Sequence, residues 1–105
     1  MQTELRRGIL SLAVLSQLKE PRYGYSLLQC LEEKGLSIEA NTLYPLMRRL
    51  EAQGLLENTW DTSTARPRKY YVLSDMGREV LCELTKEWQK NCEDLNKLLG
   101  EASHE

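Results

Sequence analysis

The stretch 41–73 constrains the fold more than any other part of this 105-residue chain. Four of its apolar residues recur at helical spacing, namely Leu43, Leu46, Met47 and Leu50. This spacing predicts a helix that buries one face, and Gly54 is typical of the residue that ends such a helix. Two apolar-aromatic runs, 55–60 and 69–73, then flank a polar loop at 61–68, which predicts two antiparallel strands. A short helix followed by such a hairpin indicates a winged helix-turn-helix domain.

Two further helices are predicted before this stretch. The first covers residues 5–19 and is broadly apolar, so we expect it to be mostly buried. Its apolar positions are Leu5, Ile9, Leu12, Ala13 and Leu15. A second helix is expected to end at Gly35, and its apolar face is expected to consist of Tyr25, Leu28 and Leu31. Residues 36–40 then form the turn of the motif, with Ile38 as its buried anchor.

The start of the third helix depends on Pro45, which has no backbone N–H to donate. With Thr42 as the N-cap, Pro45 falls at the third helical position, where no intrahelical hydrogen bond is lost. We therefore predict that Thr42 caps this helix.

A long last helix is predicted after Ser74 and Asp75, which are favourable residues at a helix N-terminus. Its apolar residues form a stripe on one face, at steps of three or four from Leu81 onward. They are Val80, Leu81, Leu84, Trp88, Cys92, Leu95, Leu98 and Leu99. Residues 1–74 are predicted to form the winged helix-turn-helix domain, a fold that typically binds DNA, and this domain is too small to cover the stripe. Residues 75–105 are therefore predicted to be a dimerisation helix and tail.

Several short motifs, in this order, resemble the PadR family of bacterial transcriptional regulators. They are 23–27 (YGYSL), 42–45 (TLYP), 48–51 (RRLE) and 66–71 (RPRKYY). The resemblance implies a mainly α fold with a small β-hairpin wing, one long C-terminal helix and a homodimeric DNA-binding regulator. Two positions depart from the family pattern. Tyr23 stands where histidine is usual, and Ala65 stands where a glycine often precedes Arg66.

The predicted DNA contacts lie on the third helix and at the tip of the hairpin. They are Asn41, Thr42, Tyr44, Arg48, Arg49, Arg66, Arg68 and Lys69. In a helix-turn-helix the N-terminal part of the second helix enters the major groove, while cations at a hairpin tip suit phosphate or the minor groove. Arg48 is the better candidate for a base contact, whereas Arg49 either binds phosphate or pairs near Glu51. A solvated surface is the alternative for these cations.

The apolar stripe of the last helix predicts a dimer interface that can also hold a ligand. The residues assigned to it are Leu81, Leu84, Trp88, Cys92 and Leu95. Trp88 is either an aromatic anchor between two subunits or the wall of a pocket for a small aromatic or hydrophobic effector. Some PadR relatives with one terminal helix are multidrug sensors with a tryptophan at about this place, and the resemblance extends that role to Trp88. Cys92 is more simply explained as an inert thiol.

Charge is unevenly distributed along the chain. The formal net charge is −2 at pH 7, but residues 41–74 contain five basic and three acidic residues, whereas residues 75–105 contain four basic and eight acidic ones. DNA responds to the local field, so the basic segment is compatible with DNA binding despite the acidic total.

Few residues are available for catalysis or metal binding. The three cysteines, Cys30, Cys82 and Cys92, form no CxxC motif, and the single histidine is His104. We therefore expect reduced thiols, no metal, no cofactor and no enzymatic activity. No apolar run approaches the length of about 18 residues that a membrane span needs, and no signal peptide is recognisable, so the predicted location is the cytoplasm.

Double-stranded DNA and a second copy of the chain are the predicted partners, and a repressor of an inverted-repeat operator is the predicted function. The alternative is a winged-helix module that binds another protein, because the basic segment carries only a small excess of charge. Salt-sensitive DNA binding would distinguish the two. Strand alternation points Tyr70 and Tyr71 to opposite faces, and leaves open which of them is in the core.

Overall fold

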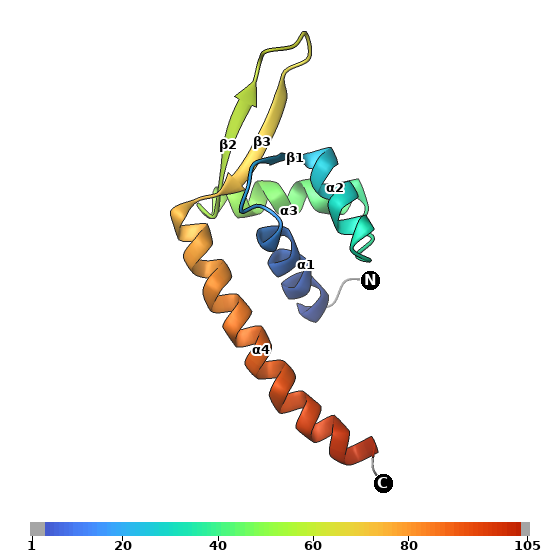
Figure 1. Cartoon of the computed structure of the whole chain (residues 1–105). Helices are drawn as coiled ribbons and strands as arrows, with labels where there is room; N and C mark the ends of the chain where they lie inside the picture. The colour runs from blue at the N-terminus through green and yellow to red at the C-terminus, as the bar shows by residue number, and fades with distance from the viewer. Residues whose placement is uncertain (1–3, 104–105) are drawn as a thin grey trace.

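The computed structural model describes residues 4–103, so His104 lies outside it. Within this range, helices pack around a small sheet, and the last helix extends well beyond the others (Figure 1). The elements are α1 Glu4–Ser16, β1 Arg22–Tyr23, α2 Gly24–Glu33, α3 Ala40–Ala52, β2 Leu56–Asp61, β3 Arg68–Leu73 and α4 Asp75–Ser103. The predicted fold, mainly α with a winged helix-turn-helix and a long C-terminal helix, is confirmed.

One continuous apolar core joins the first three helices to the sheet and to the start of α4. Its buried members are Leu10, Val14, Leu15, Leu18, Leu27, Leu31, Leu43, Leu46, Met47, Leu50, Leu56, Tyr71, Leu73 and Leu81. Each buried side chain of this size contributes roughly 1.5–3 kcal/mol. All four apolar residues predicted for α3 are buried, and Tyr71 rather than Tyr70 is the core tyrosine of β3. Ile38, in the turn before α3, packs against the edge of this core.

The sheet has the order β1-β3-β2 and is antiparallel throughout. Strands β2 and β3 form the predicted wing hairpin, in which Leu56 pairs with Leu73 at the base and Asp61 pairs with Arg68 at the far end. The hairpin projects away from the helices (Figure 1). Strand β1 is an addition that the sequence does not predict, because two residues are too few to show the alternation typical of a strand.

Gly35 and Gly54 end α2 and α3 in the left-handed conformation, with φ angles of 92° and 82°. After each glycine the chain folds back on the last helical turn. The N–H of Leu36 donates to the carbonyl of Leu31 at 2.9 Å, and the N–H of Leu55 donates to the carbonyl of Leu50 at 3.0 Å. Both predicted helix ends are confirmed, because only glycine adopts this conformation without strain.

Helix α3 begins at Ala40, so the prediction of Thr42 as its N-cap is wrong. Glu39 is the N-cap, and its carbonyl accepts the N–H of Thr42 at 3.0 Å. Pro45 therefore lies inside the helix, where it cannot donate to the carbonyl of Asn41. Asn41 is at the exposed surface, where water can take up a carbonyl that lacks a helical partner. The missing hydrogen bond of Pro45 therefore does not prevent the helix from beginning at Ala40, before the predicted cap.

Helix α1 is less buried than the sequence predicts for residues 5–19. It ends at Ser16, and its buried residues are Leu10, Val14 and Leu15. Leu5 is exposed, while Ile9 and Leu12 are only half-buried. Both line shallow depressions between α1 and α4, and Leu12 also packs against the edge of the core. In a single chain, α1 therefore has a second apolar face that is only partly covered.

The assignment of Tyr25 to the apolar face of α2 is also wrong, because its side chain is exposed. Gly24, Leu27 and Leu31 are the buried residues of α2 instead. They follow the helical steps of three and four that define the buried face. Tyr25 lies one residue away from that face, next to Gly24.

The junction between β3 and α4 is built on Ser74, a buried polar residue. Its hydroxyl donates to the carbonyl of Gly54 at 2.6 Å and accepts the N–H of Gly77 at 2.9 Å, which confirms Ser74 as a cap of α4. Its own N–H donates to the carbonyl of Leu55 at 3.0 Å. These bonds connect the end of α3 directly to the first turn of α4.

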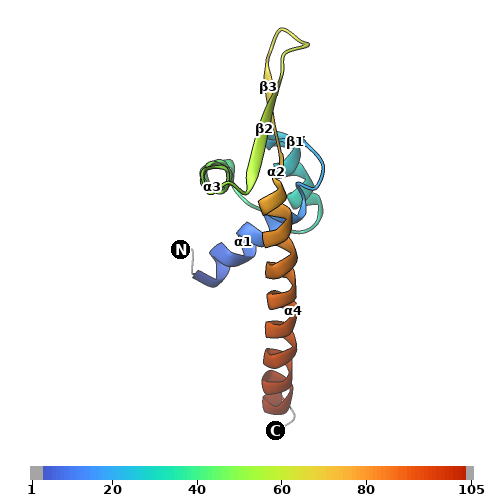
Figure 2. The ribbon, with the colours of Figure 1, turned by 90° about the vertical axis from the view of Figure 1, so that its left-hand side faces the viewer.

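From this junction α4 runs away from the domain, and only its first turns reach the core (Figures 1 and 2). The molecule consequently measures 62 × 26 × 21 Å along its principal axes. The start of α4 at Asp75 matches the predicted boundary, whereas the division into domains 1–74 and 75–105 stays a prediction. None of the helices in the described part of the chain is long and apolar enough to cross a membrane.

Replacing Gly77 with alanine is expected to destabilise the protein, by roughly 1–3 kcal/mol. A Cβ at this position would lie 2.1 Å from the backbone carbonyl oxygen of Leu55. Alanine would otherwise be favoured over glycine inside a helix by about 1 kcal/mol, so the sign of the effect is informative.

Gly100→Ala, in the same helix, is the matched control, because nothing lies within 4 Å of its added Cβ. Urea denaturation should show a lower free energy of unfolding for Gly77→Ala and an equal or higher one for Gly100→Ala. A stabilised Gly77→Ala variant would contradict the close packing at this junction.

Candidate nucleic-acid interface

Helix α3 presents a polar face on the side opposite its buried residues. Of the contact residues predicted there, Asn41, Arg48 and Arg49 are exposed, whereas Thr42 and Tyr44 are half-buried. Consecutive residues of a helix point about 100° apart, so the two arginines take different sides of this face. Arg48 follows Tyr44, which contacts α2, by four residues and precedes Glu51, which contacts the wing, by three, so it lies on the same side of α3 as these two residues. Arg49 lines a pocket together with Arg7 of α1.

Tyr44 is held in place by the start of α2. A Cβ added to Gly24 would lie 2.3 Å from the Cε1 atom of the Tyr44 ring, so only glycine allows this approach. The contact explains why a glycine follows Tyr23 in the chain. It also means that Tyr44 is positioned by packing rather than projecting freely into solvent.

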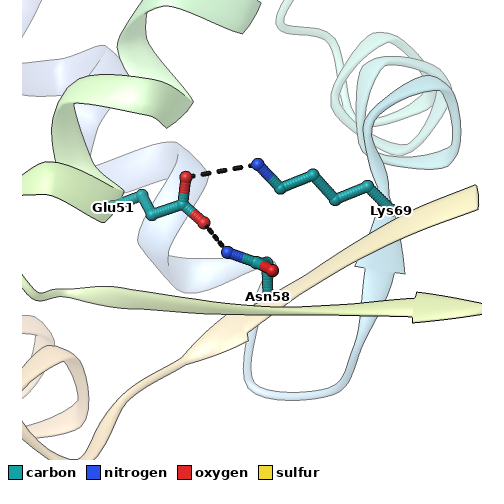
Figure 3. Close-up of polar contacts among 3 residues, drawn as sticks. All are labelled: Glu51, Asn58 and Lys69. Carbon is teal, nitrogen blue, oxygen red and sulfur yellow. Dashed lines mark hydrogen bonds and ion pairs between the residues drawn. The ribbon is translucent and has the colours of Figure 1, made fainter.

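Glu51 connects α3 to both strands of the wing (Figure 3). Its carboxylate accepts a hydrogen bond from the side-chain amide of Asn58 on β2 and forms an ion pair with Lys69 on β3 at 3.3 Å. Both partners of the ion pair are less than one-third exposed. The wing and the helix are therefore fixed to each other by polar side chains as well as by the core.

Lys69 is engaged within the protein, and its role as a DNA contact stays a prediction. Its ammonium lies 4.9 Å from the ring centroid of Tyr71 in addition to its ion pair with Glu51. Burial by itself would lower the pKa of this ammonium, but the contacts with Tyr71 and Glu51 outweigh burial and hold the pKa above its usual value. Glu51 is thus paired with Lys69, and the alternative of a partner for Arg49 near Glu51 is not observed.

The other two predicted wing cations are exposed. The guanidinium of Arg68 lies 5.1 Å from the ring centroid of Tyr23, which in turn packs edge-on against Tyr70 at 5.6 Å. Tyr23, the residue that departs from the family pattern, therefore supports one of the wing cations. Arg66 is exposed in the loop between the strands.

The loop at the tip of the wing is ordered by Asp61. Its carboxylate accepts the backbone N–H of Ser63 at 2.9 Å and the hydroxyl of Ser63 at 2.7 Å. These hydrogen bonds, with a smaller contribution from the charge of Arg68, lower the pKa of Asp61 below its usual value. Among the described residues only glycines have a positive φ, so Ala65 fits this loop without backbone strain.

A pocket of about 430 Å³ lies between α1 and α3. Arg49, which lines it, precedes Glu51 by two residues and therefore points about 200° away from the side of α3 that contacts the wing. Its lining residues are Arg7, Leu10, Asn41, Thr42, Pro45, Leu46 and Arg49. Arg7 is a residue that the sequence reasoning misses. The position of Arg7 in the sequence could have indicated its role. Arg7 precedes the buried Leu10 by three residues and the buried Val14 by seven, so it lies on the face of α1 that packs onto the domain.

The apolar stripe of α4 is largely uncovered in a single chain. Trp88 and Leu95 are 50% and 53% exposed, and Leu84 and Cys92 are half-buried. Leu81 differs from the other residues assigned to the dimer interface, because it is 7% exposed and belongs to the core of its own chain. Trp88 lines shallow apolar depressions between α1 and α4, together with Leu5, Ile9, Leu12 and Leu84.

The cysteines Cys30, Cys82 and Cys92 are free. Among residues 4–103, no cluster of histidine, cysteine or acidic side chains has the arrangement of a metal site.

A recognition-type helix, a basic hairpin beside it and a long terminal helix thus occur together in one chain. Residues 11–83 match the PadR-like family of transcriptional regulators. The chain belongs to the PadR family. The resemblance seen in its sequence motifs is confirmed.

Solved structures of PadR-family regulators agree with this assignment. The crystal structure of a PadR family transcriptional regulator from Eggerthella lenta is 56% identical, with a TM-score of 0.85 over 91% of this chain and 86% of that one. A PadR-like transcriptional regulator from Bacillus cereus, BC4206, is 31% identical with a TM-score of 0.82, over 92% of this chain and 97% of that one.

The transcriptional regulator Rv3488 of Mycobacterium tuberculosis is 31% identical over 102 residues, which are 96% of this chain and 92% of that protein. These relatives are regulators of transcription and not enzymes, as the sequence predicts for this chain.

A double-mutant cycle of Glu51→Gln and Lys69→Met should reveal coupling between α3 and the wing. Both side chains are less than one-third exposed, so we expect a coupling free energy of about 1 kcal/mol. The Lys90–Asp94 pair of α4 is the matched control, since these side chains are 77% and 56% exposed and lie 3.9 Å apart. Urea denaturation should give coupling close to zero there. Equal coupling in the two pairs would show that Glu51 does not hold the wing.

Proposed function

We propose that this PadR-family regulator is a homodimeric repressor that binds an inverted-repeat operator in double-stranded DNA. The observation that supports this most directly is the shared placement of the exposed face of α3 and the basic wing. Figure 2 views α3 nearly end-on at one edge of the molecule, with the wing extending above it. A duplex against this edge meets α3 and the wing together.

The exposed cations divide into two classes of contact. Arg48 points from α3 into the major groove, where an arginine can bind a guanine edge with two hydrogen bonds. Arg66 and Arg68 contact the backbone from the wing, with Asn41, Thr42, Tyr44 and Arg49 contributing at the groove and its edge. Lys69 acts indirectly, because its ion pair with Glu51 sets the position of the wing relative to α3.

The uncovered stripe of α4 is the proposed dimer interface. Large apolar side chains are exposed there, and the second apolar face of α1 lies beside them. The exposed apolar side chains of this surface are Leu5 on α1 and Trp88, Leu95, Leu98 and Leu99 on α4. A two-fold symmetric pairing of this surface buries it on both copies at once and places two α3 helices about 34–36 Å apart, one turn of DNA.

The same interface is the proposed site of an effector. Trp88 and the apolar residues of α1 already form shallow depressions in one chain, and a second copy would enclose them. A small aromatic or hydrophobic molecule bound against Trp88 would change how the two copies meet. The spacing of the two α3 helices would then no longer match the operator, and repression would be relieved.

Arg48→Ala and Arg68→Ala are expected to affect DNA binding differently. Fluorescence anisotropy with a duplex from the upstream region of the gene, and with a scrambled duplex, measures both affinity and preference. Arg48→Ala should cost about 1–3 kcal/mol on the upstream duplex and reduce the preference for it, whereas Arg68→Ala should weaken both duplexes alike.

Unchanged affinity and preference in both variants would refute the proposed placement of α3. If the wild-type protein showed no salt-sensitive binding to either duplex, a winged-helix module that binds protein would be the better description.

Leu95→Lys should convert the dimer into a monomer, because it puts a charge into the centre of the proposed interface. The single chain should remain folded, since Leu95 is 53% exposed in it. Glu83→Lys introduces the same residue at an exposed position away from the stripe and should leave the dimer intact. Sedimentation velocity measures the two variants, with circular dichroism as the check on folding. A dimeric Leu95→Lys variant would remove this part of α4 from the interface.

A further inference from the structure

We propose that Arg7 of α1 and Arg49 of α3 together bind one phosphate of the DNA backbone, on the side of α3 away from the wing. The proposal rests on the DNA-binding function described above and extends it to α1. It is carried by the pocket of about 430 Å³ that the two arginines line from different helices.

The chemistry of the pocket suits a phosphate. Asn41 and Thr42 line the pocket together with the two arginines. The guanidinium groups, the side-chain amide and the hydroxyl can all donate hydrogen bonds to phosphate oxygens. Apolar residues, Leu10, Pro45 and Leu46, complete the lining. Within the described chain no acidic residue lines this pocket, so nothing there competes with an anion for the arginines.

Both arginines have unused charge. In the described part of the chain, the side chains of Arg7 and Arg49 take part in no hydrogen bond or ion pair. Lys69 and Arg22 differ in this respect, since Lys69 is paired with Glu51 and the guanidinium of Arg22 donates to the carbonyl of Gln17 at 2.9 Å. Two positive groups at one pocket repel each other, and an anion between them removes that repulsion.

The position of the pocket relates it to DNA rather than to an unrelated anion. In Figure 2 the N-terminal end of α1 lies on the same side as α3, below it, while the wing extends above it. The major groove is about 12 Å wide, close to the 10–12 Å diameter of a helix with its side chains. With α3 in the groove, one phosphate backbone therefore runs along the wing and the other along the pocket of Arg7 and Arg49.

Such a contact would determine orientation and not sequence preference. Phosphate contacts fix how a protein sits on the duplex and carry no base information directly. The wing supplies contacts on one side of the groove only. Arg7 and Arg49 supply the contact on the other side and so prevent α3 from tilting in the groove.

The test measures DNA affinity as a function of salt for the full chain and its variants. Loss of one phosphate contact lowers the slope of log Kobs against log salt by about 0.9 for each half-site bound. The double variant Arg7→Gln/Arg49→Gln should show this loss and bind about tenfold more weakly at low salt, on the upstream and scrambled duplexes alike. Lys97→Gln, an exposed cation of α4, is the control for a change of charge alone and should match the wild type.

The single variants decide whether the two arginines share a phosphate. If they do, the effects of Arg7→Gln and Arg49→Gln are non-additive, and the double variant loses one contact per half-site. An additive loss of about 1.8 per half-site would show two separate phosphates and overturn the proposal. Because both side chains are exposed, all variants should remain folded, as circular dichroism can confirm.

Other outcomes identify which idea fails. If the wild type binds DNA and the double variant behaves like Lys97→Gln, this inference is wrong and the proposed function stands. If Arg7→Gln changes the preference between the duplexes, Arg7 contacts a base and the phosphate assignment is wrong. If the wild type binds neither duplex, both proposals fail.

A free anion shares the chemistry of the DNA phosphate. Calorimetric titration with inorganic phosphate distinguishes the two sources. Binding of inorganic phosphate that depends on Arg7 and Arg49, with an unchanged DNA salt slope in the double variant, would make the pocket a free-anion site and overturn the DNA assignment.

Discussion

The bonds of Ser74 set the geometry on which the rest of this structure depends. They hold the last turn of α3, the start of β2 and the first turn of α4 at one point. Gly77 is needed at the same point, because the carbonyl of Leu55 occupies the place of any Cβ. A buried hydroxyl with both its donor and its acceptor used leaves little freedom for α4 to change direction. The exposed face of α3 and the direction of α4, along which we propose that two copies pair, are therefore fixed relative to each other.

The cations of the domain differ in how far the protein itself uses them. Lys69 contributes to structure through Glu51 and Tyr71, and Arg68 packs on Tyr23 while remaining at the surface. Arg48, Arg66 and the arginines of the α1–α3 pocket have no such internal partners in the described chain. Because Arg7 lies outside residues 41–74, the small positive excess of that segment does not include all of the positive charge near α3. An overall charge of −2 conceals it further, because most of the acidic residues of the C-terminal half lie along α4.

Local sequence patterns predicted the features that depend on neighbouring residues. The ends of α2 and α3 follow from glycines in a left-handed conformation, the buried face of α3 from its leucine spacing, and the start of α4 from Ser74. The start of α3 was mispredicted, because a hydrogen-bond argument about Pro45 ignored that water can satisfy an exposed carbonyl. The two residues of β1, the pairing of Lys69 with Glu51 and the pocket shared by α1 and α3 depend on segments far apart in the chain. Spacing along a single helix contains only part of that information, as the position of Arg7 illustrates.

The length of α4 turns small angular changes into large displacements. A helix of 29 residues is about 44 Å long at 1.5 Å per residue. By simple trigonometry, a rotation of about 5° at its first turn moves its far end by about 4 Å, more than the rise of about 3 Å that two residues make along the helix axis. The packing of Gly77 against Leu55 therefore sets the direction of α4 at its first turn, and this direction determines where side chains several turns away are positioned.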